Sequence, residues 1–198
     1  MLAKEIKPKK CKAPGCGKLF KPTMTTQKVC SIACAKAIAK DPKLQKVAAK
    51  AITKQARQDL QERREKLKTK GEHLREAQQA FNAYIRERDR LAGYACISSG
   101  RPLDWNGNAV DAGHYRSTGA APHLRFDENN CHAQSKHDNR YLSGSVADYR
   151  VGLIKRIGIE AVEALERDQS VRRYTIEDLQ AIKALYRQKL RDLKRAAA

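Results

Sequence analysis

The spacing of apolar residues predicts helices over most of the chain. The pair Asp41-Pro42 is typical of a helix start, because aspartate caps the first turn and proline suits the first helical position. In the following segment, residues 44–70, a few apolar residues at the start give way to a stretch, 55–70, that is polar almost all round, so we expect a solvated helical arm. A second capping pattern, Thr69 followed by Glu72, opens a more amphipathic helix that should pack on a core. Its apolar residues are Leu74, Ala77, Phe81, Tyr84 and Ile85.

Two more amphipathic patterns fill the C-terminal part of the chain. The first covers residues 146–157 and continues into 159–165, and the second covers 175–193, opened by the capping pair Thr175 and Asp178. Apolar residues of the second pattern recur on one helix face. That face predicts packing either on the preceding domain or on a second subunit, so a monomer and a homodimer both stay open.

Residues 94–150 do not follow a helical period. Asn106-Gly107 predicts a tight turn, and residues 109–115 predict a short strand, so a hairpin should present His114. Asp138-Asn139 precedes a short helical segment that would stop at Gly144. We therefore expect a ββα order that can hold one divalent metal. The residues expected to pack it are Trp105, Tyr115, Leu124, Phe126, Tyr141 and Leu142.

Four of the six cysteines form two close pairs near the N-terminus. Their order is Cys11-x4-Cys16 and then Cys30-x3-Cys34, a spacing that suits tetrahedral zinc. Large apolar residues are few in this segment, so a bound metal would be its main stabiliser. Disulfides are the alternative, and the absence of an apolar export signal in MLAKEIKPKK argues against them.

The chain is strongly basic, with a net charge of +19 over 198 residues. The excess is +9 in residues 1–40, +6 in 41–94 and +4 in 95–198. Such a distribution favours binding to nucleic acid, with a solubility charge or an anionic lipid surface as alternatives. No stretch approaches the roughly 18 apolar residues of a spanning helix, so we expect no membrane partner and a cytoplasmic protein.

Three motifs carry a resemblance to a known family. DAGHYRS, FDENN and HAQS followed by DNRYLSG resemble the phage NinG (Rap) recombination family. The resemblance extends over nearly the whole chain, including the N-terminal cysteines and the C-terminal helices. It implies an HNH-like, metal-dependent endonuclease that acts on Holliday junctions and displacement loops in the bacterial host cytoplasm, alongside phage recombination proteins. The near two-fold symmetry of a four-way junction would suit a homodimer.

Cleavage of a phosphodiester needs a base, a cation and groups that fix both. The resemblance makes His114 the base, oriented by Asn130, and places Asn139 at the final motif position, where its carbonyl oxygen would help hold magnesium. Asp111 could supply the carboxylate, but it lies on the opposite strand face, so a bulge at Gly113 would have to realign it. The alternatives are a structural strand histidine and, for the two asparagines, roles in turns and caps.

The chain departs from the family at a second zinc site, which relatives use to brace the finger through four cysteines. The corresponding positions are Cys96, Ser99, Ser135 and Asp138. Serine hydroxyls are poor zinc ligands, so we expect no second zinc and a finger held by packing. An altered site built from Cys131, His132 and His137 is the alternative.

The sequence thus predicts a mainly α protein with a small α+β part. We expect a zinc knuckle over residues 1–40, a basic helical arm over 41–70 and an HNH-like ββα-metal nuclease domain with flanking helices over 71–198. The predicted activity is magnesium-dependent endonucleolytic cleavage of branched DNA. The alternative is a non-catalytic accessory protein that binds branched DNA through an eroded finger. An RNA-binding zinc-knuckle protein would account for the N-terminal half alone.

Overall fold

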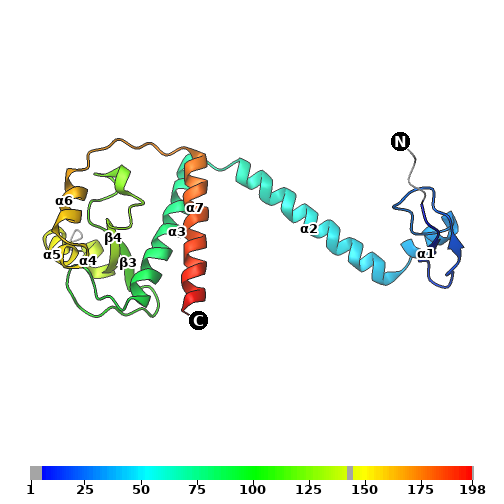
Figure 1. Ribbon diagram of the computed structural model, residues 1–198, viewed down its shortest axis with the longest axis horizontal. Helices are drawn as coiled ribbons and strands as arrows, with labels where there is room; N and C mark the ends of the chain where they lie inside the picture. Colours follow the sequence, from blue (N-terminus) through cyan, green and yellow to red (C-terminus); the bar gives the residue numbers. More distant parts are fainter. Residues whose placement is uncertain (1–5, 142–144, 198) are drawn as a thin grey trace. The chain divides into compact units, whose positions relative to one another are not determined.

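The computed structural model describes residues 6–141 and 145–197 and divides the chain into two compact units, residues 1–67 and 68–198 (Figure 1). Helices dominate the described residues, and the strands form two small antiparallel sheets. The prediction of a mainly helical chain is confirmed. Within the same described ranges, no helix is long and apolar enough to cross a membrane.

The described part of the first unit, residues 6–67, forms two short strands and two helices. They are β1 (Lys9–Lys10), β2 (Leu19–Phe20), α1 (Ile32–Ala39) and α2 (Pro42–Lys66). Asp41 caps α2 by accepting a hydrogen bond from the Lys43 amide at 2.8 Å, and Pro42 occupies the first turn, as predicted. All 25 residues of α2 are described and none is buried, so the expected solvated helix is confirmed.

The second unit contains the remaining elements. They are α3 (Lys70–Leu91), β3 (Val110–His114), a 3-10 turn (Pro122–Leu124), β4 (Cys131–Ser135), α4 (Lys136–Tyr141), α5 (Val146–Ile157), α6 (Ile159–Arg167) and α7 (Ile176–Ala196). Both predicted capping boxes are confirmed, Thr69 with Glu72 at α3 and Thr175 with Asp178 at α7. The helix expected to continue from α5 into α6 is interrupted at Gly158, whose φ of 85° is readily adopted by glycine.

The small sheet lies between two layers of helix. One face packs on α3 and α7, where the Phe81 ring meets Tyr186 edge-on with centroids 4.8 Å apart. The other face lies under α5, whose buried Tyr149 donates its hydroxyl proton to the Gly113 carbonyl at 2.8 Å. The sheet is therefore fixed by apolar packing on the face toward α3 and α7 and by a buried hydrogen bond on the face toward α5.

The residues predicted to pack the finger differ in how deeply they are buried. Tyr115 and Leu124 are buried in the core under α5 and α6, and Phe126 is partly buried against α3 and α7. Trp105 is half-buried and lines a surface hollow beside α3 and α7. The Tyr141 side chain and Leu142 lie outside the described residues.

The order of elements is β3, β4 and α4, but the predicted hairpin is wrong. Asn106-Gly107 does form a turn, with Gly107 at φ 71°, yet β3 pairs with β4, so that paired residues lie at least 17 positions apart, from His114 opposite Cys131 onward. The register runs without interruption from Val110 opposite Ser135 to His114 opposite Cys131. The bulge that would realign Asp111 with His114 is therefore contradicted.

Candidate functional site

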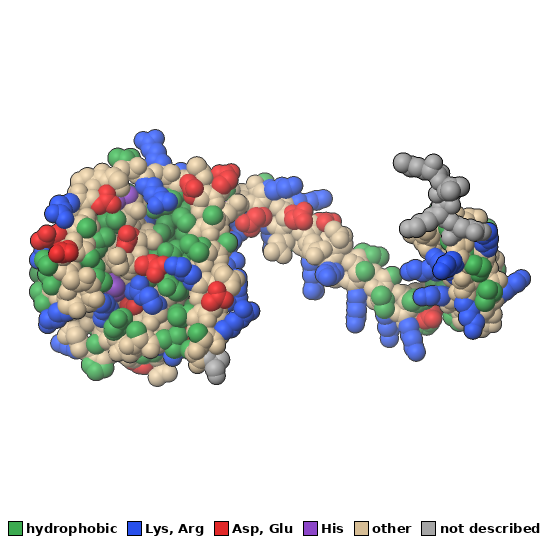
Figure 2. Space-filling view, viewed as in Figure 1, with side chains coloured by type: hydrophobic (Ala, Val, Ile, Leu, Met, Phe, Trp, Pro, Cys, Tyr) green, Lys and Arg blue, Asp and Glu red, His purple; other side chains and the backbone are tan. Residues whose placement is uncertain are grey.

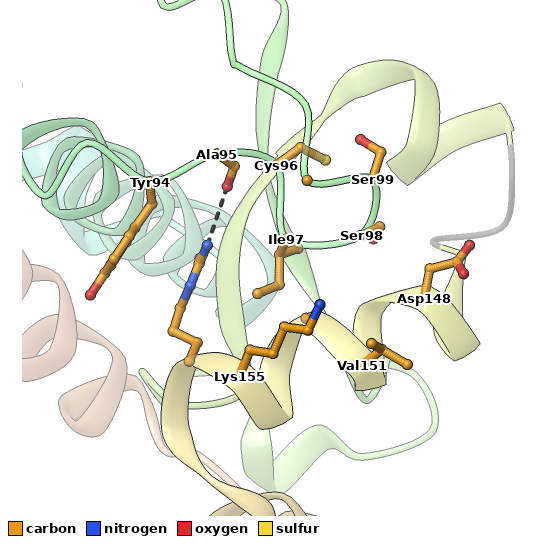
Figure 3. Close-up of a pocket in the computed structure, with 12 residues that line it drawn as sticks. Tyr94, Ala95, Cys96, Ile97, Ser98, Ser99, Asp148, Val151 and Lys155 are labelled. Atoms are coloured by element: carbon orange, nitrogen blue, oxygen red, sulfur yellow. Dashed lines mark hydrogen bonds between the residues drawn. The ribbon is translucent and has the colours of Figure 1, made fainter.

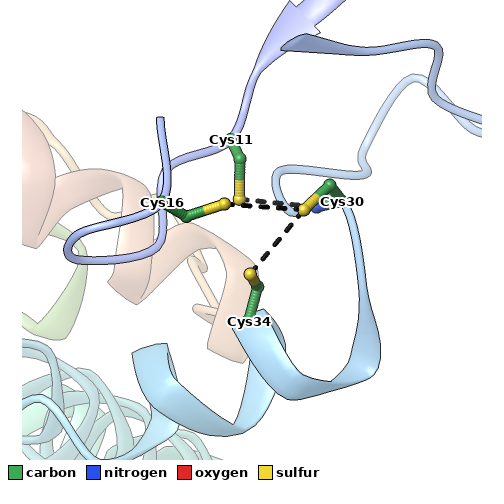
Figure 4. Close-up of side chains that lie close together, drawn as sticks. All are labelled: Cys11, Cys16, Cys30 and Cys34. Carbon is green, nitrogen blue, oxygen red and sulfur yellow. Dashed lines mark hydrogen bonds between the residues drawn. The ribbon is translucent and has the colours of Figure 1, made fainter. Parts of the chain in front are cut away.

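Four cysteine thiols converge in the first unit (Figure 4). The sulfur atoms of Cys11, Cys16, Cys30 and Cys34 all lie within 4.8 Å of one another. Cys30 Sγ lies 3.7 Å from Cys16 Sγ and 3.7 Å from Cys34 Sγ. These separations are far longer than a disulfide bond of about 2.05 Å, and all six cysteines of the chain are free. The disulfide alternative is thus contradicted.

Local backbone structure positions each thiol. Cys11 follows β1, and Cys16 lies between two glycines with positive φ, 75° at Gly15 and 57° at Gly17, which turn the chain sharply. Cys30 donates its amide to Cys11 Sγ at 3.5 Å. Backbone amides of Ala13 and Cys30 lower the pKa of Cys11 to about 7, so its thiolate, the metal-binding form, is accessible near neutral pH.

A second group of polar side chains lies where β3 meets α4. Asn139 donates from Nδ2 to Asp111 Oδ2 at 3.1 Å, and Arg140 donates from Nε to the same oxygen at 2.9 Å. The Asp111 side chain is 18% exposed and that of Arg140 is 61% exposed. The sequence analysis assigned both Asp111 and Asn139 to this site. It did not predict the contact of Arg140 with Asp111, although Arg140 directly follows Asn139 in the motif DNR.

His114 lies on the other face of the strand, because it is three residues from Asp111 and no bulge separates them. Its ring centroid is 6.0 Å from that of Phe81, on the α3 side. Nε2 lies 3.0 Å from the Arg125 carbonyl, which can only accept, so Nε2 carries the proton. Burial lowers the pKa of His114, so the imidazole is neutral at pH 7, and Nδ1 lies 3.7 Å from Cys131 Sγ.

Asn130 holds the loop between β3 and β4 rather than orienting His114. Its side chain is fully buried, its Oδ1 accepts from the Arg116 amide at 2.8 Å, and its Nδ2 donates to the Arg116 and Leu124 carbonyls at 3.0 and 3.1 Å. The partners of His114 are the Arg125 carbonyl and Cys131. The expected contact between Asn130 and His114 is therefore contradicted.

The four positions that correspond to the relatives' second zinc site, where no zinc was expected in this chain, also come together as a hydrogen-bonded cluster. Cys96 Sγ donates to Asp138 Oδ2 at 3.1 Å and accepts from the Ser135 amide at 3.3 Å. The Asp138 amide in turn donates to Ser135 Oγ at 3.0 Å. Burial raises the pKa of Asp138, but hydrogen bonds from Cys96, Ser99 and Ser135 outweigh it and lower the pKa to about 2. We call these four residues the Asp138 cluster.

The turn that carries Cys96 and Ser99 also lines a hollow of about 450 Å³ against α5 (Figure 3). Arg156 lies over the Tyr94 ring at 4.2 Å and donates to the Ala95 carbonyl at 3.2 Å. Gly152 lets α5 approach this turn, since a Cβ there would collide with the Ile97 carbonyl. The hollow is thus lined by the turn and by α5, which approach each other closely at Gly152.

The alternative metal site of Cys131, His132 and His137 is contradicted, because these side chains point in different directions. Cys131 faces His114, whereas His132, next along β4, uses Nδ1 toward Arg88 at 3.0 Å and Nε2 toward the Asn129 carbonyl at 3.1 Å. Burial is the main cause that lowers the pKa of His132 to about 4. The His137 side chain is 69% exposed.

Fold and sites together define a class of mainly helical proteins with a four-cysteine cluster in one unit and a polar site between a small sheet and a helix in the other. A family model described as "Bacteriophage Lambda NinG protein" matches residues 3–196, so the chain belongs to the NinG family. It is 43% identical to protein ninG of Salmonella phage P22 over 197 residues, covering 94% of each protein. It is 42% identical to protein ninG of Escherichia phage lambda over 205 residues, covering 98% of this chain and 97% of that protein. No solved structure matches the chain.

Proposed function

We propose that this chain is a metal-dependent endonuclease that cuts branched DNA during phage recombination. The observation that supports it is the contact between Asp111 on β3 and Asn139 on α4, 3.1 Å apart at the edge of a β3-β4-α4 unit. The sequence analysis assigned both residues to a metal site, Asn139 through the family resemblance and Asp111 as the carboxylate that could join it. Family membership and the net charge of +19 agree with a nucleic-acid substrate.

The side chains at this site fit magnesium. A carboxylate and an amide supply oxygen ligands, which this hard cation prefers, and the Asp111 carboxylate is partly open to solvent. When bound, magnesium would supply charge stabilisation at the scissile phosphate. Arg140 is exposed beside Asp111, and its planar guanidinium is suited to hold a phosphate oxygen in position.

His114 is the proton acceptor in this proposal. Its lowered pKa keeps the imidazole neutral, and its Nε2 proton is committed to the Arg125 carbonyl, which leaves Nδ1 as the basic atom. That atom lies on the face of β3 opposite Asp111. For His114 to act, the substrate must therefore reach the end of β3, where the strand closes against Cys131.

We also propose that the four-cysteine cluster binds one structural zinc ion. A zinc ion with bonds of about 2.3 Å to four sulfurs has sulfur-to-sulfur edges of about 3.8 Å. The two short separations in the cluster, 3.7 Å each, agree with that edge. The zinc would fix β1, β2 and α1 in a unit that buries few large side chains.

The test is cleavage of a labelled four-way junction and its linear duplex, in magnesium or EDTA, with binding recorded in the same reactions. Asp111→Ala and Asn139→Ala should abolish magnesium-dependent cutting and leave binding within about threefold. His114→Ala should abolish cutting as well, whereas His137→Ala, an exposed histidine nearby, should not. Junction cutting that survives Asp111→Ala would overturn the proposed metal site.

One observation favours a second candidate function, a branched-DNA-binding accessory protein without cleavage activity. His114 packs on Phe81, away from the pair of Asp111 and Asn139, so base and metal ligands do not share one face of the sheet. In the same assay, this candidate predicts tight junction binding with no cutting by any of the proteins. Homodimerisation and cooperation with phage recombination proteins stay predictions of either function.

A further inference from the structure

The helix α2 carries most of its positive charge on a single face. With about 100° of rotation per residue, six basic residues fall within an arc of about 80°. They are Lys43, Lys46, Lys50, Lys54, Arg57 and Arg64, and all are exposed. We call this set the basic stripe. Figure 2 shows Lys and Arg side chains projecting along one side of this helix.

The basic stripe is not neutralised by the helix itself. Residues 42–58 contain neither aspartate nor glutamate. Three acidic residues follow in the last part of the helix. Asp59 and Glu62 fall about 160° and 100° from Lys43 around the helix axis and Glu65 about 40°, so all three lie outside the arc. Among the described residues, no carboxylate forms an ion pair with any member of the stripe, although α3 and α7 contain several such pairs. The stripe therefore presents a row of uncompensated cations that repel one another in the free protein.

The dimensions of the stripe match one chemical class of partner. From Lys43 to Arg64 the helix rises about 32 Å, at 1.5 Å per residue. That length is close to one turn of B-form DNA, about 34 Å. A helix that buries none of its residues can lie along such a duplex without breaking a packing contact in its own fold. We propose that the basic stripe of α2 binds the phosphate backbone of duplex DNA, independently of base sequence.

The opposite side of α2 argues against a membrane surface. An interfacial helix needs a continuous apolar face with large side chains such as Trp, Phe or Leu. In α2 that side holds Leu44 and Ile52 near the start, but alanines, Asp59 and Glu62 interrupt it further along. Burying those carboxylates in lipid would be costly. The stripe, in contrast, continues past this point to Arg64.

The experiment compares two double variants in the same helix with the same change in net charge. Lys50→Gln with Lys54→Gln removes two members of the stripe, and Arg63→Gln with Lys66→Gln removes two cations outside it. Glutamine is a good helix former, and none of the four residues is buried, so both variants should fold like the wild type. Far-UV circular dichroism checks this point.

Binding of the full chain to a 30-base-pair duplex is measured in EDTA, between 0.05 and 0.3 M salt, by anisotropy. These conditions exclude cleavage, so the inference rests on the proposed function only for the choice of DNA as ligand. In the Lys50 and Lys54 variant, loss of two phosphate contacts should make the plot of log K against log salt less steep, by up to about 1.8 in slope. The affinity at 0.1 M salt should fall by roughly 60-fold. The Arg63 and Lys66 variant should change the affinity by less than about threefold.

Each outcome has one meaning. Equal losses of DNA affinity in the two double variants would overturn the proposed role of the basic stripe, because net charge alone would then explain the binding. Stripe-dependent binding to phosphatidylserine vesicles that exceeds binding to the duplex would also overturn it, in favour of a lipid surface. Absence of duplex binding by the wild-type chain would overturn the inference as well, whereas the proposed function would fail only if the chain also neither bound nor cut the junction. Stripe-dependent binding of an uncut junction would support the inference while leaving cleavage to the assay above.

Discussion

The Asp138 cluster allows a quantitative prediction about the stability of the second unit. The Asp138 side chain is only 10% exposed, and its carboxylate accepts a hydrogen bond from Cys96 Sγ at 3.1 Å. Its pKa falls from 3.8 to about 2 on folding, which corresponds to about 2 kcal/mol of stabilisation by the charged form. Asp138→Asn keeps the shape of the side chain and removes the charge. We expect this variant to lose about 2 kcal/mol of unfolding free energy at pH 7.

The sign of the pH dependence follows from the direction of the shift. A carboxylate whose pKa is lowered by folding stabilises the protein above its unfolded pKa, near 4, and this stabilisation is lost as the pH falls toward 2. Asp138→Asn has no such group. The difference between wild type and variant should therefore be full at pH 5 to 7 and should shrink between pH 4 and pH 2.

The assay is urea unfolding followed by the fluorescence of Trp105, the single tryptophan of the chain, which reports on the second unit. Asp148→Asn, an exposed carboxylate on α5, serves as control and should change stability by less than about 0.5 kcal/mol. Equal stability of Asp138→Asn and wild type at pH 7, or a difference that does not vary with pH, would refute the reasoning. A Trp105 transition that shifts with a zinc chelator would show that the cluster holds metal after all.

Other predictions concern backbone, loop and metal. Gly113→Ala should destabilise the second unit by about 1–3 kcal/mol, because a Cβ would collide with the Gln134 side chain, and adding Gln134→Ala should restore part of the loss in the Trp105 assay. Asn130→Ala should cost about 2–4 kcal/mol in that assay, since it leaves buried backbone groups unpaired; a cost below 0.5 kcal/mol would contradict the loop-holding role. Mass spectrometry should find one zinc per wild-type chain and none in Cys30→Ser, with Trp105 unfolding unchanged.

The elements predicted correctly from sequence are those that local chemistry decides. Thr69 with Glu72, Thr175 with Asp178, and Asp41 with Pro42 each satisfy the free amides of a first helical turn, so a few residues suffice to identify them. The spacing of the four N-terminal cysteines likewise predicted that their thiols lie close together.

The features that sequence reasoning missed depend on distant contacts. Asn106-Gly107 is a sound local turn signal, but burial against α3 and α5 selects β4 as the partner of β3. The role of Asn130 is visible only once the loop has closed and its amide meets the Arg116 backbone. A bulge at Gly113 was expected, whereas the glycine is needed because Gln134 crosses directly over it.

The fact that α2 buries no side chain bears on how the length of this helix can change in evolution. Residues inserted or deleted here cost no core packing, so the segment tolerates such events better than α3 or α7. The remaining constraint is the angular position of the side chains around the helix axis. Deleting one residue turns all later side chains by about 100° and splits the row from Lys43 to Arg64 between two faces, whereas deleting seven or eleven turns them by only about 20°. Length variation that preserves the row should therefore come in those larger steps.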